Sequence, residues 1–78
     1  MTEEKIQNVL ERYFNDNIEL VKVEFKDLRV YYIEIKLKNL NKVIISIYRW
    51  DAHYSENANI HSIILELEYN ILNLYRRK

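Results

Sequence analysis

The sequence contains no glycine and no proline in 78 residues, and it also has no cysteine. Average usage would supply roughly five glycines and four prolines in a chain of this length. Glycine lets the backbone adopt positive φ angles and approach phosphate groups closely, and many catalytic loops depend on it. We therefore expect regular helices and strands whose function rests on side chains, with asparagine at the turns that need positive φ.

The length of the chain is that of one domain, and we expect residues 1–78 to form it. A core of this size gives modest stability, and without cysteine it has no disulfides to reinforce it. Oligomerisation is the remaining common reinforcement, so a homodimer is expected. The two histidines are too few for a recognisable metal site, and we expect no metal and no other cofactor.

The charges of the chain cancel, with twelve basic and twelve acidic residues. This balance disfavours a strong non-specific nucleic-acid binder, which usually carries a basic excess. No apolar run approaches the roughly 18 residues that a membrane span needs, and the charged start Met1–Lys5 does not resemble a signal peptide. We expect a cytoplasmic protein without a membrane segment. Its many Asn, Ile, Lys and Tyr residues indicate an AT-rich bacterial or phage genome.

Two segments have the apolar spacing of helices. In residues 3–14 the apolar positions recur at i, i+3, i+4, i+7 and i+8. They are Ile6, Val9, Leu10, Tyr13 and Phe14. Residues 55–76 form the second segment, with Ser55 as the expected N-cap. The expected core positions there are Ile60, Ile63, Ile64, Leu67, Ile71, Leu74 and Tyr75.

Residues 18–50 alternate with period two and predict three antiparallel strands. The expected inward positions are Val21, Val23, Phe25, Tyr31, Ile33, Ile35, Leu37, Val43, Ile45 and Ile47. Three-residue turns at 27–29 and 39–41 place Val23 opposite Ile33, and Ile33 opposite Ile47. Asparagines are expected to take the turn positions that glycine normally fills: Asn15, Asn17, Asn39 and Asn41.

The α-β-β-β-α order predicts an α+β fold, a two-layer sandwich. Its sheet is a three-stranded antiparallel meander in the order 1-2-3, with both helices on one face. This order resembles the double-stranded-RNA-binding domain and small ribonuclease toxins of the HicA type. The former family has a basic run where this chain has Ser55–Asn59, with one acid and no Lys or Arg. The toxins use a histidine early in the sheet, and residues 1–52 contain none.

The second helix carries an apolar stripe away from its core positions, formed by Leu65, Tyr69 and Leu72. Scattered exposed apolar residues are normal, and they are one explanation of it. The other is a partner-binding stripe, most simply a symmetric helix-on-helix homodimer.

The expected register also predicts an aromatic and a basic region on the outer face of the sheet. Tyr32 faces Tyr48, Trp50 lies at the same end, and Lys36 lies near Ile44. Cross-strand aromatic pairs can simply stabilise a sheet. They also suit recognition of a protein, or stacking on single-stranded bases beside lysines.

Candidate chemistry is sparse. Asp51, His53 and Ser55 lie in one segment, but residues so close in sequence rarely form a triad, and no glycine turn supplies an oxyanion hole. Ser55 fits better as a helix cap and Asp51 as a turn residue.

We therefore expect no enzyme. The chain is predicted to be a small regulator or inhibitor that binds a macromolecule, most simply a protein, as a homodimer. The alternative is a nucleic-acid-binding module that uses the outer sheet face.

Overall fold

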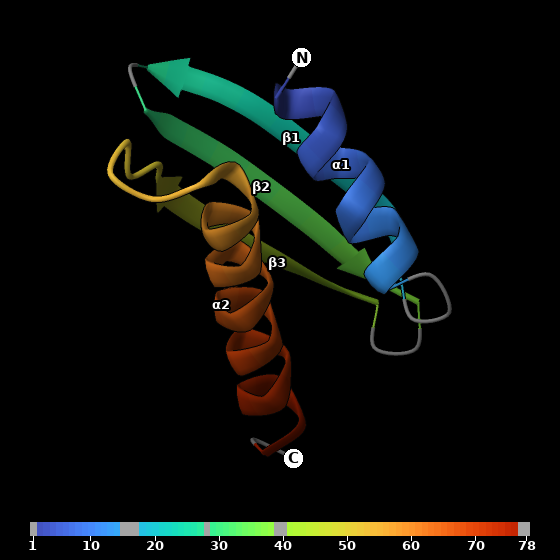
Figure 1. The fold of residues 1–78 in the computed structure, drawn as a ribbon. Helices are drawn as coiled ribbons and strands as arrows, with labels where there is room; N and C mark the ends of the chain where they lie inside the picture. The colour runs from blue at the N-terminus through green and yellow to red at the C-terminus, as the bar shows by residue number, and fades with distance from the viewer. Residues whose placement is uncertain (1, 15–17, 28, 39–40, 77–78) are drawn as a thin grey trace.

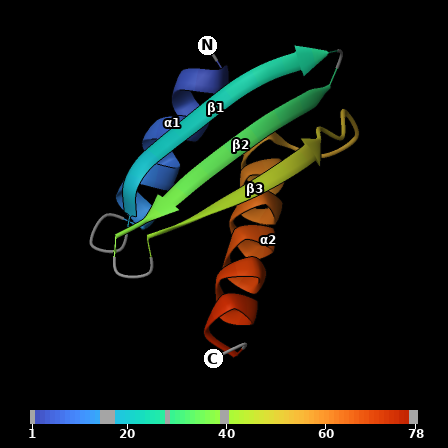
Figure 2. The ribbon, with the colours of Figure 1, turned by 180° about the vertical axis from the view of Figure 1, so that it is seen from behind.

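The computed structural model describes residues 2–14, 18–27, 29–38 and 41–76. Two helices and three strands follow one another: α1 (Thr2–Tyr13), β1 (Ile18–Asp27), β2 (Val30–Leu37), β3 (Lys42–Arg49) and α2 (Glu56–Arg76). The antiparallel sheet has the order β1-β2-β3, and both helices cover one face of it (Figures 1 and 2). This confirms the expected α+β sandwich. We call the covered face the helix side and the other the outer face.

Helix α1 packs against β1 through the apolar face that its spacing predicts. Ile6 and Leu10 are fully buried, and Phe14 directly after the helix is also buried. Glu3 and Glu4 lie in the first turn, where negative charge suits the positive end of the helix dipole. Tyr13 differs from the expectation, because its ring is half exposed and its hydroxyl donates to Glu68 of α2 at 2.6 Å.

The pairing of β1 with β2 agrees with the expected register. Val23 lies opposite Ile33, and Phe25 lies opposite Tyr31. The turn is one residue shorter than expected, because Asp27 pairs with Val30 after a register irregularity. Arg29 in this turn has a φ of 67°, a conformation in which only glycine is free of strain.

The pairing of β2 with β3 differs from the expected register by one residue. Ile33 faces Ser46 instead of Ile47, and Leu37 faces Lys42 instead of Val43. A shift of one residue turns every side chain of a strand to the opposite face. Residues Ile44, Ser46 and Tyr48 therefore point to the helix side, and the expected inward set Val43, Ile45 and Ile47 lies on the outer face.

The cause of this difference is that β3 is apolar on both faces. Ile44 and Tyr48 on one parity compete with Val43, Ile45 and Ile47 on the other, so alternation does not determine the face. The β2–β3 connection also has four residues, 38–41, rather than three. Asn41 has a φ of 49°, as expected of it. Asn15, Asn17 and Asn39 lie outside the described residues.

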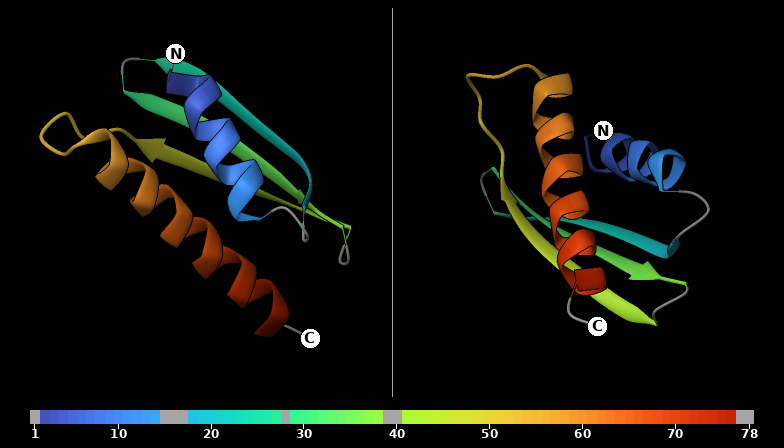
Figure 3. Two further views of the ribbon diagram at one scale, coloured as in Figure 1. Left: turned by 45° about the vertical axis from the view of Figure 1, so that its right-hand side comes forward. Right: turned by 90° about the horizontal axis from the view of Figure 1, so that it is seen from below.

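Helix α2 begins over the sheet and ends beyond it. Ile60, Ile63, Ile64 and Leu67 in its first three turns are buried, but Ile71 and Leu74 farther along are only partly buried. The C-terminal half of α2 extends past β3, away from β1 and β2 (Figures 1 and 3). The Tyr75 side chain lies outside the described part of the structure. No helix of the described residues is long and apolar enough to cross a membrane.

Candidate interaction surfaces

The connection from β3 to α2 is organised by one buried polar side chain, Asn59. Its Oδ1 accepts hydrogen bonds from the Tyr48 hydroxyl at 2.8 Å and from the Asp51 amide at 2.9 Å. Its Nδ2 donates to the carbonyl oxygens of Asp51 at 2.9 Å and Ser55 at 3.0 Å. Because a fully buried amide needs such partners, Asn59 ties the end of β3 to the start of α2. The sequence gives a weak signal for it, an asparagine next to the buried Ile60 of an amphipathic helix.

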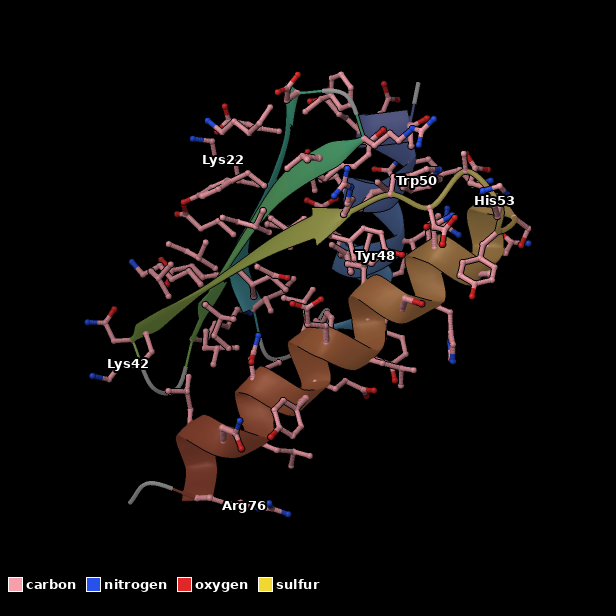
Figure 4. The ribbon with its side chains drawn as sticks, turned by 90° about the vertical axis from the view of Figure 1, so that its left-hand side faces the viewer. Lys22, Lys42, Tyr48, Trp50, His53 and Arg76 are labelled. Atoms are coloured by element: carbon pink, nitrogen blue, oxygen red, sulfur yellow. The ribbon has the colours of Figure 1, made fainter. Side chains whose placement is uncertain are left out.

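The residues considered for a catalytic triad have structural roles in this connection. The Ser55 Oγ accepts from the Ala58 amide at 3.1 Å, which confirms Ser55 as the N-cap of α2. The Asp51 Oδ1 accepts from the His53 amide at 2.8 Å, as in a turn that aspartate closes. The His53 side chain is exposed (Figure 4). These contacts account for Ser55 as a helix cap and Asp51 as a turn residue.

Three of the residues expected on the outer face lie on the helix side instead. Ile44 is buried in the core, and the partly buried Tyr48 and Trp50 pack against that core (Figure 4). The Trp50 ring lies 5.4 Å from the Tyr31 ring, and the Trp50 amide donates to the Arg29 carbonyl. Burial raises the pKa of the Tyr48 hydroxyl. The expected pair of Tyr32 with Tyr48 is therefore wrong, and Tyr32 lies opposite Ile47.

The outer face of β1 and β2 has side chains of both charges. The Tyr32 hydroxyl donates to Glu34 at 3.0 Å, and this hydrogen bond raises the pKa of Tyr32. The Lys36 ammonium lies 3.8 Å from the Glu19 carboxylate. Lys22 and Glu24 form an ion pair at 3.0 Å, and their hydrogen bond lowers the pKa of Glu24 and raises that of Lys22. Tyr32 and Lys36 thus lie where they were expected, on a face of mixed charge.

An aliphatic row that sequence reasoning assigned to the core lies on the outer face of β3. Its members are Val43, Ile45 and Ile47, with exposed fractions of 49%, 52% and 67%. A sheet face in solvent usually alternates with polar residues at such positions. The sequence feature that could have indicated this ambiguity is the run from Val43 to Tyr48, which contains no charged residue. We call these three residues the β3 row.

The stripe on α2 is exposed. Leu65, Tyr69 and Leu72 have exposed fractions of 51%, 64% and 54%. They lie on the side of the helix opposite to the buried Ile63 and Leu67, as the spacing predicts. We call these three residues the α2 stripe.

The described residues hold no group of three or more His, Cys, Asp or Glu side chains that could bind a metal ion. The hollows recorded along α1 are open and lined by polar and charged side chains such as Glu4, Asn8 and Arg12. The exposed large hydrophobic side chains of the described residues are the β3 row, the α2 stripe, Tyr13, Phe25 and Tyr54. Comparisons with models of protein families, with curated protein sequences and with solved structures find no match to this chain.

Proposed function

We propose that this chain is a small non-enzymatic interaction protein that binds another protein and works as a homodimer through the α2 stripe. A regulator or inhibitor that occludes a site on its partner needs only a rigid scaffold and such surfaces. The observation that carries the proposal is the gathering of half-exposed apolar side chains on two regular elements. Contiguous apolar patches of this kind commonly mark interfaces in soluble proteins.

The pattern of the α2 stripe suits a second copy of the same helix. When two α2 helices pack antiparallel about a two-fold axis, Leu65 of one copy lies near Leu72 of the other, and the two Tyr69 rings meet near the axis. A two-fold interface requires such self-complementarity, because the same patch is used by both copies. Residues that contribute most of the binding energy of an interface are often aromatic and lie near its centre, as Tyr69 would here.

The nucleic-acid alternative has less support from the arrangement of the side chains. Tyr32 lies on the outer face, whereas Tyr48 and Trp50 lie on the helix side, so they do not form one stacking platform. Glu24 and Glu34 also accompany the lysines of the outer face. Titration of single- and double-stranded RNA and DNA at low salt tests this alternative directly.

Light scattering coupled to size exclusion, over a range of protein concentrations, tests the homodimer. We expect a dimer for the wild type and a monomer for the double variant Leu65→Asp with Leu72→Asp, because charge at an apolar interface is costly. The control is Arg12→Asp on the exposed face of α1, which changes the net charge by the same amount and should leave a dimer. A wild-type monomer at all concentrations, or a double variant that stays dimeric, would contradict the proposal.

A further inference from the structure

The apolar face of α2 is longer than the sheet beneath it. Ile71 and Leu74 continue the buried face of Ile63 and Leu67, yet they are only partly buried. The reason is visible in Figures 1 and 2, where this part of α2 has passed the last strand, β3. A helix that packs on a sheet normally covers its apolar face over the whole length. The half-buried end of α2 therefore lies over the position that a fourth strand, next to β3, would occupy.

The backbone edge of β3 is open to pairing. Its outward N–H and C=O groups have no hydrogen-bond partner among the described residues. The register of β3 has no bulge, and between Lys42 and Arg49 it has no charged side chain. Soluble proteins usually protect long apolar edges with charges, bulges or a covering segment. Between the charged ends Lys42 and Arg49, β3 has neither a charge nor a bulge in the described structure.

We propose that an extended segment of a partner protein pairs with β3 as a fourth strand, beneath the C-terminal half of α2. This inference rests on the proposed protein-binding function and names the mode of binding. Strand addition to an open edge is a recurring mode of peptide recognition, in which backbone hydrogen bonds supply affinity and alternate side chains supply specificity. On the outer face the new strand would extend the β3 row, and on the helix side it would contact Ile71 and Leu74.

The chemistry of the edge indicates the sequence of the segment. Both faces of the added strand meet apolar side chains, so its central residues should be aliphatic, about five or six in number as in an ordinary strand. The ends of β3 are basic, with Lys42 at one end and Arg49 at the other, and Lys38 lies just before the strand. Opposite charges across neighbouring strands are stabilising. The segment should therefore have acidic residues on both sides of its aliphatic centre.

A second copy of the chain fits this edge poorly. Antiparallel self-pairing of β3 places both α2 helices on the same face of the joined sheet, and each extends over the edge that the other must enter (Figure 3). An isolated extended segment carries no second helix and does not have this problem.

A synthetic peptide tests the inference on the wild-type protein. The probe is fluorophore-labelled Glu-Asp-Val-Ile-Val-Ile-Val-Asp-Glu, and the measurement is fluorescence anisotropy. The control peptide has the same sequence and is N-methylated at successive central residues, so that neither edge of the strand can donate a full row of hydrogen bonds. We expect the control peptide to lose at least about tenfold in affinity. Equal binding of the control and the probe, or no binding of the unmodified probe, would overturn strand addition.

Variants of the protein then locate the binding site. Ile45→Lys should lower the affinity for the probe by at least about tenfold, and Tyr69→Lys on the α2 stripe should leave it within about twofold. The double variant Lys42→Glu with Arg49→Glu should prefer a probe with lysine in place of its acidic ends. Equal loss in Ile45→Lys and Tyr69→Lys would contradict the assignment to β3, as would an unchanged charge preference.

The two proposals fail separately. If the probe does not bind but the α2 variants abolish a wild-type dimer, strand addition is wrong and the homodimer stands. If β3 amides instead become protected from hydrogen exchange as protein concentration rises without any probe, a second copy occupies the edge, and this inference is overturned. Binding of the probe by a protein that remains monomeric would contradict the homodimer alone.

Discussion

The two edges of the sheet are treated differently. The β1 edge has two register irregularities, and the Phe25 amide donates to the Glu3 carboxylate of α1 at 2.6 Å. Lys22 and Lys26 also place charge along β1. The β3 edge has an uninterrupted register, an uncharged centre and no such contact among the described residues. Contacts within the chain therefore protect part of the β1 edge, and no corresponding contact is found at the β3 edge among the described residues.

The order of the elements explains this difference. Helix α1 precedes β1 and packs on it, so that its first turn brings Glu3 to the strand. Helix α2 follows β3 and covers it only from the helix side, before extending past the edge (Figure 4). At the β1 edge the Glu3 carboxylate already accepts from the Phe25 amide and the register is irregular, whereas the β3 edge has neither feature among the described residues. Four substitutions test how much individual residues near the two edges contribute to the stability of the protein.

The largest effect is expected at Asn59, the residue that holds β3 to α2. Asn59→Ala removes its hydrogen bonds to Tyr48, Asp51 and Ser55, and leaves buried groups without partners. We expect the free energy of unfolding to fall by about 2–4 kcal/mol, measured by urea denaturation. The control is Asn57→Ala, an exposed position in the same helix. Equal effects of the two variants would show that the end of β3 does not depend on this side chain.

The face of β3 is tested at Ser46. Its hydroxyl is buried and has no hydrogen-bond partner, so Ser46→Ala should raise the free energy of unfolding by about 1 kcal/mol. If Ser46 were on the outer face, as the sequence predicts, the change would be nearly neutral. Because the chain has no cysteine, thiol labelling gives a second measurement. Ile45→Cys should react rapidly with a thiol reagent and Ser46→Cys slowly, and the reverse order would contradict the register.

The protection of the β1 edge is tested at Glu3. Glu3→Ala removes the acceptor for the Phe25 amide, and we expect a loss of about 1 kcal/mol in unfolding free energy. Glu4→Ala in the same turn is the control, because it alters the helix-dipole interaction without touching β1. Hydrogen exchange of the Phe25 amide should become faster in Glu3→Ala only. If the two variants behave alike, the carboxylate does not protect the edge.

The smallest effect is expected at the turn between β1 and β2. Arg29 has a φ of 67°, and Arg29→Gly removes the strain of a side chain in this region. Part of the gain is offset by the greater freedom of glycine in the unfolded chain, so we expect thermal unfolding to show a stabilisation of about 0.5 kcal/mol. Asn41→Gly should gain less, since asparagine tolerates its φ of 49° better than arginine does. A loss of stability in Arg29→Gly would contradict this account.

Much of the fold could be predicted from segments whose apolar spacing is compatible with only one structure. The helices match the segments that their apolar spacing predicts, to within one residue at their starts. The β1–β2 register follows because Val21 and Val23 alternate with Lys22 and Glu24, so only one face of β1 is apolar. The α2 stripe was visible for the same reason, as apolar residues on a face that the core does not use.

The sequence by itself determined the helices and strands and their order, and it excluded glycine and proline turns. The tertiary structure alone decided which face of β3 is buried, because that strand is apolar on both. The decision rests on contacts between distant residues: the Tyr48 hydroxyl bonds to Asn59 of α2, and the Trp50 amide bonds to Arg29. Turning the strand by one residue would break the first of these and leave a buried amide oxygen with one partner fewer. For that physical reason Val43, Ile45 and Ile47 lie outside, beside the open edge.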